Sequence, residues 1–172
     1  MDCFFSKKLR VFNTCFEFKS KIKFLACSAN KSIILPESTE PRILQAVSVC
    51  TRLGIAQCVL LGKIKYINEL ALKLGISFGK GLKVIDPDLI RKDYISCLVQ
   101  KRALQGMNEK LAKISLQDNM LLSTLMLDNG EVDGIVSGVV NTTANTIRPA
   151  LQIIKSKNNF SLVSSVFFYV TS

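Results

Sequence analysis

Short apolar runs alternate with longer amphipathic segments along most of the chain. The short runs are rich in β-branched residues and predict strands at Ser32–Leu35, Gln57–Leu61, Leu82–Ile85, 131–136 and 161–170. In the longer segments apolar residues recur about every three or four positions, as on one face of a helix. This period predicts helices at 40–53, 63–74, 89–104, 108–127 with a break near Asp118, and from about Pro149 to Lys155.

Strands that alternate with helical crossovers are typical of a mostly parallel sheet with helices on both faces. We therefore predict an α/β fold, a three-layer sandwich. At 172 residues and 48% hydrophobic content, the chain is long enough to bury the core of one domain. We divide it into residues 1–32, a basic extension of unknown role, and residues 33–172, which carry the alternating pattern.

Residues 1–32 differ in composition from the rest of the chain. They hold six of the ten phenylalanines, seven Lys/Arg and two Asp/Glu, and neither glycine nor proline. Basic residues interrupt every apolar run, which argues against a secretory signal. Two interpretations stay open: an organellar presequence, and a weakly docked extension that carries a helix over residues 19–29.

The overall composition excludes several classes of site. Half of the net charge of +10 lies in residues 1–32, and the remaining basic residues are diffuse, so we expect no nucleic-acid partner. No apolar run reaches the roughly 18 residues of a membrane helix, so we expect no membrane partner. The chain has no histidine and no C-x-x-C pair, so we expect no metal site. We interpret the six cysteines as reduced thiols of a cytoplasmic protein.

The glycine-rich segment Gly75–Gly81 is similar to a phosphate-binding loop but departs from it. Its spacing is one residue short, and glycine stands where that loop needs serine or threonine. We predict that it is only the turn that ends a helix.

One arginine stands out in a long stretch without positive charge. No lysine or arginine occurs between Lys113 and Arg148. Arg148 directly precedes Pro149, a residue favoured at the first position of a helix, so we expect Arg148 near a helix N-terminus whose free NH groups attract anions.

The polar loop before Arg148 follows a predicted strand and so lies at the carboxyl edge of the sheet, where α/β proteins bind ligands. Ser137, Thr143 and Asn145 are candidate hydrogen-bond donors there. The residues alone leave two interpretations open: an anion site, and an ordinary polar loop with helix caps.

Four blocks of the chain, in order and over about residues 33–168, share one further feature. The blocks are Ile34-Leu35-Pro36-Glu37 with Glu40-Pro41-Arg42, then RLGIAQCVLLG from Arg52, then Arg102 with Gly106-Met107, and VDGIVSGVVNTTANTIRPALQIIK from Val132 through SLVSSVFF. Together they resemble the phosphate acetyl/butyryltransferase family. One departure is Asn141, which stands where the family often has histidine.

The resemblance implies that an acetyl group passes directly between coenzyme A and phosphate, as part of acetate metabolism, with no metal or redox cofactor. It implies that Arg102 and Arg148 bind these anionic substrates, with Ser137, Thr143 and Asn145 as further substrate-binding candidates. The partners implied are acetyl-CoA, CoA, phosphate and acetyl phosphate, with a homo-oligomer when the protein is full length.

The resemblance also implies that the domain is incomplete here. The catalytic acid/base residues are expected beyond Ser172, so we expect the 172 residues alone to be inactive. Two alternatives stay open: a preference for a longer acyl group such as butyryl, and a truncated, non-catalytic remnant or acetyl-CoA-binding module of the same family.

Overall fold

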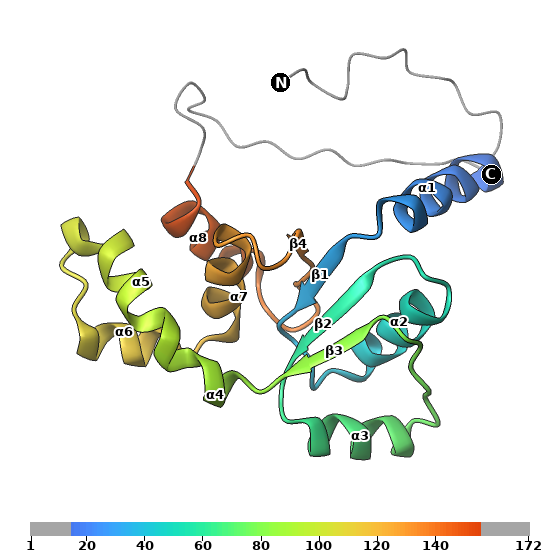
Figure 1. Ribbon diagram of the computed structural model, residues 1–172, viewed down its shortest axis with the longest axis horizontal. Helices are drawn as coiled ribbons and strands as arrows, with labels where there is room; N and C mark the ends of the chain where they lie inside the picture. The colour runs from blue at the N-terminus through green and yellow to red at the C-terminus, as the bar shows by residue number, and fades with distance from the viewer. Residues whose placement is uncertain (1–14, 156–172) are drawn as a thin grey trace, which may run out of the picture.

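A computed structural model describes residues 15–155 of the chain (Figure 1). Its centre is a parallel sheet with the strand order β3-β2-β1-β4. The strands are β1 (Ser32–Leu35), β2 (Gln57–Leu61), β3 (Leu82–Ile85) and β4 (Gly134–Ile135). The helices are α1 (Cys15–Ala29), α2 (Pro41–Arg52), α3 (Ile64–Lys73), α4 (Pro87–Ile90), α5 (Ile95–Lys101), α6 (Glu109–Ser115), α7 (Asn119–Asp128) and α8 (Thr143–Ile153), with 3₁₀ turns η1 (Arg91–Tyr94) and η2 (Ala103–Gln105).

Alternate residues of the central strands supply two separate cores. In β1 and β2, Ile34, Val59 and Leu61 face the helices that follow β3, including α5, α6 and α7. Leu35 and Leu60 face α2 and α3 on the other side. Side chains alternate between the faces of a strand, so two adjacent apolar residues can each enter a different core. The predicted three-layer α/β fold is confirmed.

The single helix predicted at 89–104 is wrong. The structure divides this region into α4, η1, α5 and η2. Two contacts hold the 3₁₀ turn η1: Arg91 bonds to the turn between α6 and α7, and the buried Tyr94 donates its hydroxyl hydrogen to Glu131. A regular apolar period cannot distinguish one long helix from shorter helices that turn between distant partners. The break predicted near Asp118 is confirmed, because Asp118 caps the start of α7.

The helix predicted to begin at Pro149 is also wrong. Helix α8 begins at Thr143, because the Thr142 hydroxyl accepts a hydrogen bond from the Asn145 NH at 3.3 Å and caps the helix. Pro149 lies inside α8, where it lacks the NH that would bond to the Asn145 carbonyl. Proline marks a helix start only when no stronger cap lies upstream. Strand β4 is also shorter than the 131–136 predicted.

The glycine-rich segment at Gly75 is a helix-ending turn, as predicted. Gly75 has φ +62°, and the NH groups of Gly75 and Ile76 donate to the carbonyls of Leu72 and Ala71, which closes α3. A side chain at Gly79 would collide with the Thr51 carbonyl.

Helix α1 includes the helix predicted at 19–29 and is largely exposed. Phe16 and Phe24 are 81% and 70% exposed, and the Cys27 thiol reaches the Leu53 carbonyl at 3.6 Å. Within residues 15–155, no helix is long and apolar enough to cross a membrane. The strand predicted at 161–170 lies outside the described residues.

Candidate functional site

The loops that follow β1 and β4 meet at the same edge of the sheet, because the two strands are parallel neighbours. The carboxylate of Glu37, two residues after β1, accepts hydrogen bonds from consecutive NH groups of the loop after β4. The donors are Gly138 at 3.1 Å and Val139 at 3.1 Å to Oε2, and Val140 at 2.8 Å and Asn141 at 2.7 Å to Oε1. One buried side chain therefore fixes the backbone of the loop.

The environment of Glu37 favours its charged form. Burial of this residue, which is 8% exposed, raises the pKa of the carboxyl group, and it is the largest single influence. The NH groups of Asn141, Val140, Val139 and Gly138 together outweigh burial, so the pKa lies below its ordinary value of 4.5. Glu37 is therefore a carboxylate at neutral pH.

The turn that carries Glu37 is itself held in place. The buried Ser38 hydroxyl donates to the Leu61 carbonyl at the end of β2, and a Cβ on Gly62 would lie only 2.6 Å from that hydroxyl oxygen. The Glu40 NH donates to the Glu37 carbonyl at 3.1 Å. These contacts limit the positions that the Glu37 side chain can adopt.

Arg42 links the same turn to the loop after β4. Its Nε lies 2.6 Å from Glu40 Oε1, and its guanidinium also donates to the Val139 carbonyl at 3.4 Å. The ion pair with Arg42 is the main reason that the pKa of Glu40 is lowered. Within the loop, the Asn141 side-chain amide donates to the Ser137 hydroxyl at 3.4 Å.

A hollow of about 320 Å³ lies between the end of α5, helices α6 and α7, and one face of α8. Its lining residues are Arg102, Ile114, Ser115, Asp118, Leu121, Asn145, Arg148, Pro149 and Gln152. Arg102 is half-buried and donates to the Gln152 side-chain oxygen at 3.2 Å, whereas Arg148 is exposed. Among residues 15–155, no carboxylate forms an ion pair with either arginine.

The one carboxylate of this hollow within the described residues is already engaged. Asp118 accepts a hydrogen bond from the Met120 NH at 2.8 Å and so caps α7. The hollow therefore holds two guanidinium groups against a single carboxylate, which favours an anionic ligand.

A second hollow of about 530 Å³ shares Arg148 and Gln152 with the first. It is lined by Thr143, Ala144, Ile147, Arg148, Leu151 and Gln152 of α8. Its walls are mainly apolar, so a ligand that spans both hollows would place a charged part near Arg102 and an apolar part near Leu151.

The structure brings together some of the residues predicted from the sequence. Arg102, Arg148 and Asn145 line the first hollow and Thr143 the second, whereas Ser137 lies in the loop and lines neither. The reason given for Arg148 was wrong: it is well inside α8 rather than at the helix N-terminus, so free NH groups do not surround it.

Sequence reasoning missed Glu37 and Gln152. Both lie inside the blocks that carry the family resemblance, and this position was the one signal in the sequence that could have marked them as site residues. Neither shows a local pattern of its own, because their partners are distant in the sequence: Gln152 lies 50 residues from Arg102 and Glu37 more than 100 from the loop after β4.

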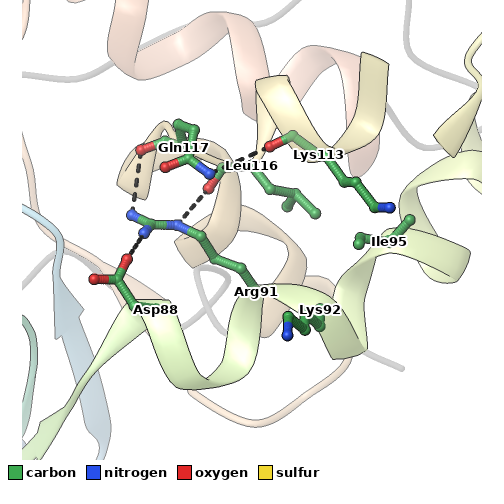
Figure 2. Close-up of a pocket in the computed structure, with 7 residues that line it drawn as sticks. All are labelled: Asp88, Arg91, Lys92, Ile95, Lys113, Leu116 and Gln117. Atoms are coloured by element: carbon green, nitrogen blue, oxygen red, sulfur yellow. Dashed lines mark hydrogen bonds and ion pairs between the residues drawn. The ribbon is translucent and has the colours of Figure 1, made fainter. Parts of the chain in front are cut away.

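A further hollow, of about 370 Å³, lies between α4, η1 and α6 (Figure 2). Its central residue Arg91 is 15% exposed in its side chain and is occupied by structural partners. Figure 2 shows its guanidinium between Asp88 and the carbonyls of Leu116 and Gln117, which accept at 2.8 and 3.3 Å. We interpret this hollow as part of the packing between α4 and α6.

The described residues offer few other reactive groups. Among residues 15–155, no three His, Cys, Asp or Glu side chains cluster as metal ligands would. The thiols of Cys27, Cys50, Cys58 and Cys97 are free. Burial raises the pKa of Cys58 to about 11, so this thiol is protonated at neutral pH.

Residues 17–172 match the model of one protein family, described as phosphate acetyl/butaryl transferase. The chain is 53% identical over 152 residues to the phosphate acetyltransferase of Buchnera aphidicola (Schizaphis graminum) and 50% identical over 151 residues to that of Escherichia coli K12. Each match covers 88% of this chain and 21% of the relative, so the chain spans about a fifth of the length of these proteins.

Solved structures give the same family. The EutD phosphotransacetylase from Staphylococcus aureus superposes with a TM-score of 0.76 at 27% identity, over 88% of this chain and 46% of that one. A phosphotransacetylase from Streptococcus pyogenes superposes with a TM-score of 0.71 at 25% identity, over 87% and 45% of the two chains.

Proposed function

Because the chain belongs to the phosphate acetyl/butaryl transferase family, we propose that it forms part of an enzyme that transfers an acetyl group between acetyl-CoA and inorganic phosphate. The two relatives described above are named for this activity. The same likeness supports acetyl-CoA, CoA, phosphate and acetyl phosphate as the substrates and products of this enzyme. It also supports a role in acetate metabolism.

The observation that carries the proposal is the convergence of Arg102 and Arg148 on one hollow. Arg102 caps the end of α5 and Arg148 lies in α8, and no carboxylate among residues 15–155 forms an ion pair with either. Guanidinium groups bind phosphate oxygens through paired hydrogen bonds, and both substrates of the proposed reaction carry phosphate groups. Gln152 holds Arg102 in place before any ligand arrives.

The proposed reaction needs charge stabilisation and orientation more than covalent catalysis. A phosphate oxygen attacks the thioester carbonyl, the carbon–sulfur bond breaks, and the thiolate of CoA accepts a proton. Arg102 and Arg148 would align the phosphate and offset negative charge that develops in the transition state. The apolar hollow beside Leu151 suits the uncharged pantetheine arm of coenzyme A.

Within residues 15–155, the two hollows contain no thiol and one carboxylate, Asp118. This carboxylate caps α7 through Oδ1, which gives it a structural role. The catalytic acid/base therefore stays a prediction for residues outside those described. A cytoplasmic location, the absence of a cofactor, and a homo-oligomeric state are further proposals, supported by the free thiols and the family match.

A chimaera tests the proposed function. The segment of this chain that matches the Escherichia coli phosphate acetyltransferase would replace its counterpart in that enzyme, and acetyl phosphate formation from acetyl-CoA and phosphate would be measured. We expect turnover, and we expect that Arg102→Gln with Arg148→Gln abolishes it. Lys113→Gln is the matched control, because Lys113 is exposed and lines neither hollow of the site.

A chimaera that folds but has no activity would contradict the proposal. If it still binds coenzyme A, the result would favour a non-catalytic binding module instead.

A further inference from the structure

The Glu37 carboxylate is fully occupied by the loop after β4. Each of its oxygens accepts two hydrogen bonds, and the donors are four consecutive NH groups. Consecutive NH groups that point to one place form a concave, anion-binding backbone. Here the anion is a side chain of the same protein, and it is 8% exposed.

The chain gives Glu37 little freedom to leave this position. Ser38 donates to the Leu61 carbonyl at the end of β2, and this close approach requires a residue without a side chain at Gly62, where a Cβ would lie 2.6 Å from the Ser38 hydroxyl oxygen. The turn makes a further contact with the loop, because Arg42 donates a hydrogen bond to the Val139 carbonyl. The turn after β1 therefore acts as a fixed template for the backbone of the loop.

The loop leads directly into the helix that carries the candidate substrate-binding residues. The NH of Asn141 is the last of the four groups on Glu37, and the next residue, Thr142, caps α8. Asn145 and Arg148 follow within the same rigid helix. A change in the backbone at Asn141 would therefore displace the start of α8 and the residues on its first turns.

We propose that Glu37 is a positioning residue for the acyl-transfer site: its carboxylate sets the backbone of residues 138–141 and, through Thr142, the placement of Asn145 and Arg148. This inference rests on the proposed function for its catalytic meaning. Glu37 does not line either hollow, so it acts through the loop and not on the substrate itself.

Substitutions of Glu37 separate its charge from its size. Glutamine keeps the length of the side chain, but its amide group would place NH donors against NH donors of the loop, so it can satisfy only half of them. Aspartate keeps the charge on a side chain that is shorter by one methylene. The control is Glu69→Gln in α3, an exposed glutamate that forms no ion pair within residues 15–155 and lines neither hollow.

The first experiment records the amide signals of the ¹⁵N-labelled 172-residue chain. In wild type we expect slow hydrogen exchange at residues 138–141, and a common shift of their amide signals as the pH falls and Glu37 is protonated. Glu40 and Arg42, which belong to the same turn, interact electrostatically with Glu37. The wild-type titration remains informative even if Glu37→Gln does not fold.

The second experiment titrates each variant with coenzyme A. We expect Glu37→Gln to lose the slow exchange and to bind coenzyme A about tenfold more weakly, the scale of losing hydrogen bonds to a charged group. We expect Glu37→Asp to keep part of the slow exchange and part of the affinity for coenzyme A, and Glu69→Gln to resemble wild type.

Three outcomes would overturn the inference: loop amides that do not follow the carboxyl titration in wild type, loop amides unchanged in Glu37→Gln, or changed amides with unchanged affinity for coenzyme A. Failure of the wild-type chain to bind coenzyme A would instead count against the proposed function. In that case the amide signals of residues 138–141 and of Asn145 and Arg148 in the Glu37 variants still decide whether Glu37 positions them.

Discussion

Nη1 of Arg102 donates a hydrogen bond to Oε1 of Gln152 across 3.2 Å, and this contact joins the end of α5 to α8. Gln152 lies four residues after Arg148, so both project from the same face of α8. The glutamine thus orients one arginine while its own helix supplies the other. Helix α8 packs against α7, which Figure 1 shows beside it, and this packing sets where Arg148 and Gln152 lie.

Arg148→Gln should weaken substrate use without unfolding the protein, because Arg148 is exposed and forms no ion pair among the described residues. In the chimaera described above, we expect a loss of about 2 to 4 kcal/mol in transition-state stabilisation, the scale for one charged donor. Steady-state kinetics with acetyl phosphate and coenzyme A measure it. Kinetics equal to those of Lys113→Gln would contradict the assignment.

Gln152→Leu should affect binding less than the loss of an arginine. Arg102 keeps its charge but loses the partner that orients it, so we expect coenzyme A to bind about three- to tenfold more weakly, the worth of roughly one hydrogen bond. Calorimetric titration measures the affinity. Gln100→Leu, on the exposed side of α5, is the matched control and should bind like wild type. Equal affinities in the two variants would show that Arg102 needs no such partner.

Leu122→Ala should destabilise the fold strongly. Leu122 of α7 is fully buried in the core that α5, α6 and α7 build on the sheet. Removal of a buried leucine side chain leaves a cavity and costs about 2 to 5 kcal/mol. Urea denaturation measures the loss. Leu72→Ala in α3, where the leucine is 81% exposed, should change the free energy of unfolding by less than about 0.5 kcal/mol. A comparable loss in both variants would place the core elsewhere.

Asp133→Asn should lower stability at neutral pH but not in acid. The hydrogen bond from Lys31 at 2.7 Å, and then that from the Ser32 NH at 2.9 Å, lower the pKa of Asp133 below its ordinary value of 3.8. The stabilisation that the Asp133 carboxylate gives is therefore complete above about pH 3.8. It is lost as the pH falls through the lower pKa of the folded state.

Urea midpoints of Asp133→Asn and wild type should accordingly differ at pH 7 and converge as the pH falls below 3.8 and through the lower pKa of the folded state. Asp93→Asn is the control, because Asp93 is exposed and has no ion pair within residues 15–155. A difference between Asp133→Asn and wild type that persists unchanged in acid would show that the charge of Asp133 is not what stabilises the strand edge.

The sheet was the part of the fold most readily predicted. The three strands at Ser32–Leu35, Gln57–Leu61 and Leu82–Ile85 match their predicted bounds, because each is a compact, mainly apolar run that is packed on both faces. The helices between β3 and β4 were harder. Their breaks depend on partners such as Glu131 for Tyr94, which no local period encodes.

The site was predictable in its residues more than in its geometry. Arg102 and Arg148 were identified through the family resemblance, and the structure places them on one hollow. The start of α8 was predicted at Pro149, six residues too late, because proline gives a strong local signal for a helix start. The residue that caps the helix, Thr142, is one polar residue among several in the loop. Glu37 could not be assigned a role, since its function depends on a loop about 100 residues later.

The hydrogen bonds between Glu37 and the loop after β4 also bear on how the chain folds. They join residues 101 to 104 positions apart, so closing that loop costs more chain entropy than any local turn. The helices between them can form first, whereas the bonds to Glu37 can form only once β1 and β4 are paired. We therefore expect these bonds to be absent from the folding transition state. Substitutions at Glu37 should then speed unfolding and leave the folding rate nearly unchanged.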